Sequence, residues 1–140
     1  MSSTKRLFTP DEVDERIPQL ETAFGHINTC KARAEVLVSQ AVAQKPLTLP
    51  ADVAQAQLAQ SQIEFLMGAI QDDINYILSL GGITKDIDQG LVDFPGEIDG
   101  QEVCLCWKMG EANVRFWHGL DEGFANRQAL SHSDPDPTLH

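Results

Sequence analysis

The residues best suited to chemistry lie in one stretch near the end of the chain, LCWKMGEANVRFWHGLDEGF, residues 105–124. Within it, Asp121 follows His118 by three residues, so a turn could bring the carboxylate back to the imidazole ring. A histidine with a carboxylate partner is typical of metal sites and of general bases. These two residues are therefore candidate ligands of a divalent transition metal. The structural alternative is a rim or core histidine that a neighbour hydrogen-bonds.

A three-stranded antiparallel meander is predicted over residues 91–118. Alternating apolar residues are interrupted there by an Asp-Gly turn and by a second turn around Gly110. A two-residue Asp-Gly loop places Phe94 opposite Leu105, and the second turn then places Leu105 opposite Phe116. The face that should pack on the helices carries seven apolar residues: Val92, Phe94, Val103, Leu105, Trp107, Val114 and Phe116.

The other face of this meander carries polar groups in one row. The same register aligns Asp93, Cys106 and Arg115, with Trp117 beside them. A guanidinium next to a thiol could lower the thiol pKa, which would suit an anion site, a nucleophile or a thiol sensor. The alternative is a cross-strand ion pair over a half-buried thiol, worth about 1 kcal/mol or less. The candidate binding residues are Asp93, Cys106, Arg115, Trp117, Glu111 and Arg127.

His118 and Glu111 fall at opposite ends of the predicted sheet. The register puts His118 on the apolar face, at the end of its strand. Glu111 lies in the second turn, about 15 Å or more away along the strands. The two could share a metal only if the strand bends or a second copy of the chain contributes. Arg127 could pair with Asp121 or with an acidic partner.

A helix start signal stands at residues 8–13, FTPDEV. Thr9 can cap the helix, a proline occupies its first turn, and Glu12 completes a capping box. This helix should run to about Gln44, with a kink at Pro18.

A second helix is predicted over about Ala51–Leu80, with apolar residues spaced by three and four. The connection is short, so the two helices should form a long antiparallel hairpin of coiled-coil type. Asp73 is the acidic member of the second apolar stripe. It is either a ligand or acid with His26 nearby, or a carboxylate at the edge of the stripe that reaches water. Apolar residues on more than one side of residues 65–80 predict a homodimer with a four-helix core.

Composition and charge exclude some classes of function. A chain of 140 residues predicts a single domain, residues 1–130, followed by a disordered polar tail, residues 131–140. The net charge of −11 argues against a nucleic-acid partner. No stretch reaches the ~20 apolar residues of a membrane span, and no signal-peptide core opens the chain. We therefore expect a cytoplasmic protein that has no membrane contact.

Three blocks, GLVDFP, DGQEVCLCWKMGE and WHGLDEGFANR, together with Lys85-Asp86, resemble the bacterial family called domain of unknown function 2203. The resemblance covers roughly residues 8–130. It implies a cytosolic bacterial protein and brings no established activity. The recurring motif residues fall at Asp86, Asp93, Trp107, Glu111, Trp117, His118, Asp121, Gly123, Phe124 and Arg127.

The sequence thus predicts an α+β fold, with a long antiparallel two-helix hairpin packed on a small three-stranded meander. Two functions follow. The first is a homodimeric binding or interaction module without catalysis and with a possible protein partner, because phosphate loops and nucleophile elbows are missing from the sequence. The second is a small metal-dependent or acid–base enzyme that uses His118 and Asp121.

Overall fold

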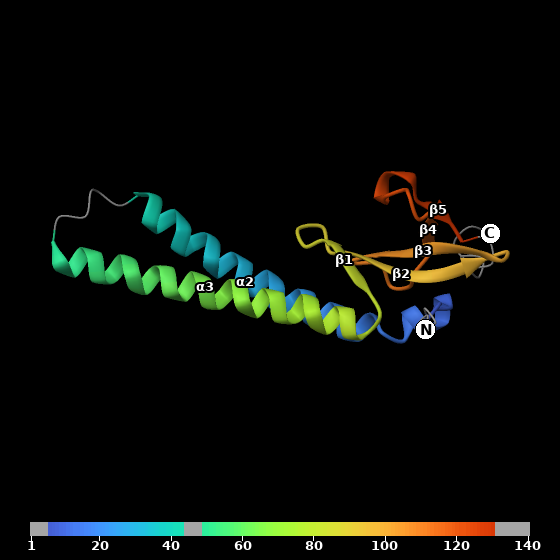
Figure 1. Ribbon diagram of the computed structural model, residues 1–140, viewed down its shortest axis with the longest axis horizontal. Helices are drawn as coiled ribbons and strands as arrows, with labels where there is room; N and C mark the ends of the chain where they lie inside the picture. Colours follow the sequence, from blue (N-terminus) through green and yellow to red (C-terminus); the bar gives the residue numbers. More distant parts are fainter. Residues whose placement is uncertain (1–5, 44–48, 131–140) are drawn as a thin grey trace, which may run out of the picture. The chain divides into compact units, whose positions relative to one another are not determined.

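The computed structural model describes residues 6–43 and 49–130. The chain divides into two compact units: residues 22–76 form one, and the segments before and after them form the other. The first unit is helical and the second contains an antiparallel sheet (Figure 1), so the α+β class is confirmed. The predicted tail, residues 131–140, and most of the helix connection lie outside the described residues. None of the helices in the described part of the chain is long and apolar enough to cross a membrane.

The first helix is short, and its start matches the prediction. Helix α1 spans Pro10–Asp14. The hydroxyl of Thr9 accepts from the backbone N–H of Glu12 at 3.2 Å, and the backbone N–H of Thr9 donates to the Glu12 carboxylate at 2.9 Å. Both halves of the capping box are therefore present, and they satisfy N–H groups that a helix start leaves unpaired.

A single kinked helix was expected here, but the chain leaves the helix after Asp14 and begins again as α2, Ile17–Ala43. Pro18 is the cause, because its ring clashes with the carbonyl four residues back and offers no N–H to it. At the end of α1, the Asp14 side chain accepts from the backbone N–H of Val114 at 2.8 Å and from the Asn113 amide at 3.2 Å.

Helix α3 spans Pro50–Ser79, within a residue of the prediction. In the unit of residues 22–76, α2 and α3 run antiparallel, side by side (Figure 1). Ile27, Cys30 and Leu37 of α2 are buried there. The helical hairpin is therefore confirmed, and its supercoiling stays a prediction.

The sheet has five strands rather than three, in the order β1-β2-β3-β4-β5 with every neighbouring pair antiparallel. The strands are β1 (Ile83–Asp86), β2 (Leu91–Ile98), β3 (Gln101–Lys108), β4 (Phe116–His118) and β5 (Gln128–Ala129). The sequence missed β1 and β5 because runs of four and two residues carry little alternation. The turn between β2 and β3 is the predicted Asp-Gly hairpin, with φ of 52° at Asp99 and 81° at Gly100.

The register of the first hairpin was predicted correctly, and that of the second was wrong by one residue. Phe94 pairs with Leu105, as expected. Leu105 then pairs with Trp117 rather than Phe116, and Cys106 pairs with Phe116. Since side chains alternate between the faces of a strand, this slip inverts the whole of β4.

The shift arises in residues 109–115, which form an irregular loop instead of a tight turn. Val114 is buried, as the apolar pattern required, but its backbone N–H is bound by the Asp14 carboxylate and not by a strand. Burial of Val114 therefore says nothing about the face of β4.

One face of the sheet packs on the N-terminal segment. The rings of Phe8 and Phe94 meet edge to face with centroids 5.3 Å apart. Phe8 also pairs with Gly96 through a parallel bridge. A Cβ on Gly96 would lie 2.6 Å from Cγ of Leu105, so only glycine fits this close approach.

Candidate metal centre

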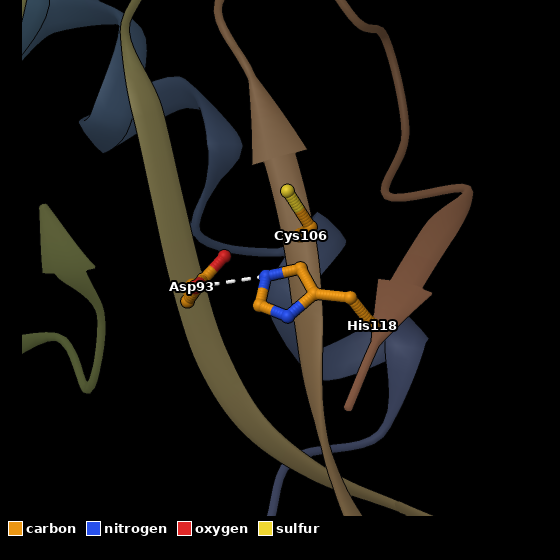
Figure 2. Close-up of side chains that lie close together, drawn as sticks. All are labelled: Asp93, Cys106 and His118. Carbon is orange, nitrogen blue, oxygen red and sulfur yellow. Dashed lines mark ion pairs between the residues drawn. The ribbon is translucent and has the colours of Figure 1, made fainter. Parts of the chain in front are cut away.

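Three buried side chains from three adjacent strands meet on the other face of the sheet. Asp93 of β2 and His118 of β4 face each other, and Cys106 of β3 lies beside them (Figure 2). Each offers one ligand atom, and these atoms all lie within 4.8 Å of one another. The observed register creates the group, because Asp93 pairs with Cys106 and the slip in β4 turns His118 to their side.

The hydrogen bond made by one nitrogen of His118 determines the role of the other. Nδ1 lies 2.9 Å from the carbonyl oxygen of Gly119. A carbonyl can only accept, so Nδ1 carries a proton and donates it. In the neutral ring, Nε2 then has its lone pair free and faces Oδ2 of Asp93 at 3.0 Å (Figure 2). A backbone carbonyl that fixes the tautomer in this way is the usual second partner of a metal-ligating histidine.

The carboxylate of Asp93 is buried, and hydrogen bonds within the described chain do not replace its lost contact with water. The residue is 4% exposed, and neither oxygen has a hydrogen bond of good geometry within the described chain. The contact with His118 is therefore an ion pair by distance only. An unsatisfied buried carboxylate is costly, so a further positive partner for these oxygens would stabilise the site.

Cys106 is a protonated thiol in the absence of a cation. Burial, and then the negative charge of Asp93, raise its pKa to about 12, while the positive charge of Arg127 acts in the opposite direction. The prediction that Arg115 would lower this pKa was wrong, because the register places Phe116 opposite Cys106. A thiol sensor at Cys106 needs a lowered pKa, and the structure shows the reverse.

Two other predicted binding residues, Glu111 and Arg127, form an ion pair. Nη1 of Arg127 lies 3.0 Å from Oε2 of Glu111, with both side chains largely buried. Glu111 also accepts from the backbone N–H of Lys108 at 2.8 Å. The guanidinium lies over the rings of Phe116 and Phe124, at 4.1 and 4.2 Å from their centroids. Arg127 thus places a fixed positive charge near Cys106.

The remaining predicted site residues do not join the group of Asp93, Cys106 and His118. Asp121 is exposed, and it is Asp93 that faces His118. Trp117 pairs with Leu105 on the opposite face, and Arg115 is exposed. The sequence identifies His118 as a candidate ligand and places Asp93 beside Cys106, but it puts His118 on the opposite face, because residues 109–115 form a longer loop than the predicted turn.

The three donors fit a small transition metal. Zinc binds thiolate sulfur at about 2.3 Å and imidazole nitrogen or carboxylate oxygen at about 2.0–2.2 Å, so its ligand atoms lie roughly 3.5 Å apart. The separations here, up to 4.8 Å, need only small side-chain rotations to reach that value. One sulfur, one nitrogen and one oxygen donor suit zinc or its neighbours better than calcium or magnesium.

Comparison with known proteins gives a family and no activity. A family model described as an uncharacterized conserved protein (DUF2203) matches residues 6–130. No curated protein and no solved structure matches this chain.

Proposed function

This chain belongs to the family of uncharacterized conserved proteins DUF2203, and we propose that it binds one zinc-like divalent cation through Asp93, Cys106 and His118. The observation that carries the proposal is the convergence of three buried donors around a carboxylate whose oxygens have no hydrogen bond of good geometry within residues 6–43 and 49–130. In this role the cation links β2, β3 and β4, the strands that supply the three ligands.

A buried ion pair between Asp93 and His118 is the competing explanation. It would engage Oδ2 of the carboxylate, whereas Oδ1 has no hydrogen bond of good geometry in the described chain, and the Cys106 thiol would act only as a donor toward Asp93. A cation engages all three groups at once, provided that the thiol gives up its proton. The metal therefore explains more of the arrangement than the ion pair does.

Burial indicates what kind of centre this is. All three ligands are at most 4% exposed. Structural zinc sites are closed and as a rule four-coordinate, whereas catalytic sites combine three protein ligands with a position open to water and substrate. Three ligands match the catalytic count, but their burial closes the site to substrate. The cation is therefore proposed to hold the sheet together, and this role supports a binding protein better than a metal-dependent enzyme.

Cobalt titration of metal-free, reduced protein tests the proposal. A Co²⁺–thiolate bond gives charge-transfer absorption in the near ultraviolet, so the spectrum reports Cys106 as a ligand. We expect saturation at one equivalent per chain and competition by Zn²⁺. Cys106→Ser should lose the charge-transfer band. Cys104→Ser is the matched control, since Cys104 lies on the same strand outside the three-residue group, and it should keep the band.

Either of two results would overturn the proposal: no saturable binding by wild-type protein, or equal spectra for the two serine variants. Circular dichroism of both variants shows whether they remain folded. If Cys106→Ser unfolds, His118→Gln with elemental analysis replaces it, and retention of a full equivalent of zinc would then contradict the assignment.

A second candidate function is self-association through the hairpin. Large apolar side chains are exposed on α3, among them Leu58 at 60% and Phe65 at 76%. These two are seven residues apart and so share one face of the helix. A second copy of the hairpin, covering this face, would form the four-helix core of a homodimer.

Light scattering coupled to size-exclusion chromatography tests the dimer. The wild-type protein should run at twice the 15.4 kDa chain mass, and Phe65→Lys should shift it toward the monomer. Glu64→Lys, on the adjacent and also exposed position, controls for the added charge. A monomeric wild type at all concentrations would exclude this role and leave the metal proposal unaffected.

A further inference from the structure

We infer that Cys30 is a reactive thiol, activated by His26 and Asp73, that hydrogen peroxide oxidises. All three residues belong to the unit of residues 22–76, with His26 and Cys30 on α2 and Asp73 on α3. Nδ1 of His26 forms an ion pair with Oδ2 of Asp73, and Nε2 of the same ring lies 3.7 Å from Sγ of Cys30. Carboxylate, imidazole and thiol in this order make up an activated cysteine nucleophile.

The order of the contacts fixes the positions of the protons. An ionised carboxylate only accepts hydrogen bonds, so Nδ1 of His26 carries a proton toward Asp73. In the neutral ring Nε2 is then the acceptor, and the Cys30 thiol must donate to it. Transfer of that proton gives a thiolate beside an imidazolium, and Asp73 stabilises the imidazolium by a charge-assisted hydrogen bond.

Sequence spacing and helix pairing build this cluster. His26 and Cys30 are four residues apart, so they lie on one face of α2. The antiparallel hairpin brings Asp73 of α3 to the same level, as the sequence suggested for His26 and Asp73. Cys30 is 6% exposed, whereas the side chain of His26 is 55% exposed. The sulfur is therefore within reach of small reagents only, while the ring can exchange protons with water.

The surroundings favour peroxide over acyl substrates. Acyl transfer needs donors for an oxyanion, and inside a continuous helix the backbone N–H groups are already used in its own hydrogen bonds. Attack on hydrogen peroxide needs no such donors. The thiolate sulfur bonds to one oxygen as the O–O bond breaks, and the departing hydroxide takes the proton from Nε2 of His26 and leaves as water. Sulfur is oxidised to a sulfenic acid and the peroxide is reduced.

The test measures oxidation of Cys30 in full-length protein by peptide mass spectrometry. The protein is treated with hydrogen peroxide at pH 7 and quenched with catalase. It is then unfolded, and its remaining thiols are alkylated, so that the label does not depend on access in the native state. We expect Cys30 to oxidise on the order of tenfold faster in the native protein than in the urea-unfolded chain. His26→Gln and Asp73→Asn should each remove most of this difference in oxidation rate between native and unfolded protein.

Asp72→Asn is the matched control, because it removes the same charge from the adjacent, exposed residue of α3 and should keep the wild-type rate. Equal rates for the Asp72 and Asp73 variants, or no difference between native and unfolded wild type, would overturn the inference. If a variant loses helix by circular dichroism, the comparison of native with urea-unfolded wild-type protein decides, because it needs no substitution.

Discussion

Nε2 of His118 reaches across β3 to within 3.0 Å of Oδ2 of Asp93, so two strands that are not neighbours are joined through their side chains. Both residues are almost fully buried. A buried carboxylate beside a histidine costs free energy unless the charges are balanced and hydrogen-bonded. Substitutions at this site should therefore change both the stability of the protein and its response to a cation.

Asp93→Asn should have different effects with and without metal. In metal-free protein the change removes a buried carboxylate that has no hydrogen bond of good geometry in the described chain, and it should leave stability unchanged or raise it. In wild-type protein, free zinc at about 100 times its Kd should add about 2.7 kcal/mol to the free energy of unfolding, and the variant should lose this gain. Urea denaturation with and without zinc measures both effects. Asp121→Asn, an exposed carboxylate, should keep the full zinc effect, and its loss there would place the ligands elsewhere.

Cys106 in metal-free, folded protein should resist alkylation. Its pKa is raised to about 12, first by burial and then by Asp93, so the protonated thiol dominates throughout the neutral range. At pH 8 its thiolate fraction is roughly a thousandfold below that of a free thiol. Iodoacetamide labelling followed by peptide mass spectrometry should show Cys106 unlabelled in native protein and labelled in urea. Rapid labelling of Cys106 in the native protein would contradict the burial and charge described for this thiol.

Thr9→Ala should destabilise the protein by about 1 kcal/mol, the usual cost of losing a helix cap. The hydroxyl of Thr9 is the acceptor for the N–H of Glu12, and alanine offers none. Urea denaturation measures the change. Thr9→Ser keeps the hydroxyl and should be close to wild type, so equal losses in both variants would point to the methyl group instead of the cap.

The same capping box should make stability depend on pH in acid. The hydrogen bond from the backbone of Thr9, and then the hydrogen bond from Arg6, lower the pKa of Glu12 below 4.5. A carboxyl whose pKa is lower in the folded state stabilises the protein above its unfolded pKa, and this contribution is lost as pH falls through the folded pKa. The difference in melting temperature between wild type and Glu12→Gln should therefore be constant above pH 5 and shrink toward pH 3. A constant difference down to pH 3 would be the contrary result.

Two glycine-to-alanine changes should have opposite signs. Gly96→Ala places a methyl group 2.6 Å from Cγ of Leu105 and 3.1 Å from the carbonyl of Phe8, so overpacking should cost about 1–3 kcal/mol. Gly25→Ala adds a methyl group with no atom within 4 Å, in the interior of α2, and should stabilise by up to about 1 kcal/mol. Thermal unfolding of both variants provides the comparison, and destabilisation by Gly25→Ala would show that the helix surface there is covered.

Local signals identify the start of α1 and the first hairpin, because each depends on a few neighbouring residues. The capping box needs only Thr9 and Glu12, and the pairing of β2 with β3 needs only the Asp-Gly turn. The face of β4 could not be obtained in this way. It depends on Asp14, about a hundred residues earlier, which binds the loop before the strand. For that reason the sequence places His118 on the wrong face, although it places Asp93 next to Cys106 correctly.

The two compact units are nested in the chain, because residues 22–76 are inserted between the two parts of the other unit. During synthesis, the hairpin therefore has all of its partners as soon as α3 is complete. Phe8 and Asp14 must wait for Phe94 and Val114, which emerge from the ribosome much later. Order of emergence thus separates an early folding unit from one whose N-terminal segment can pack on the sheet only after Val114 has been synthesised.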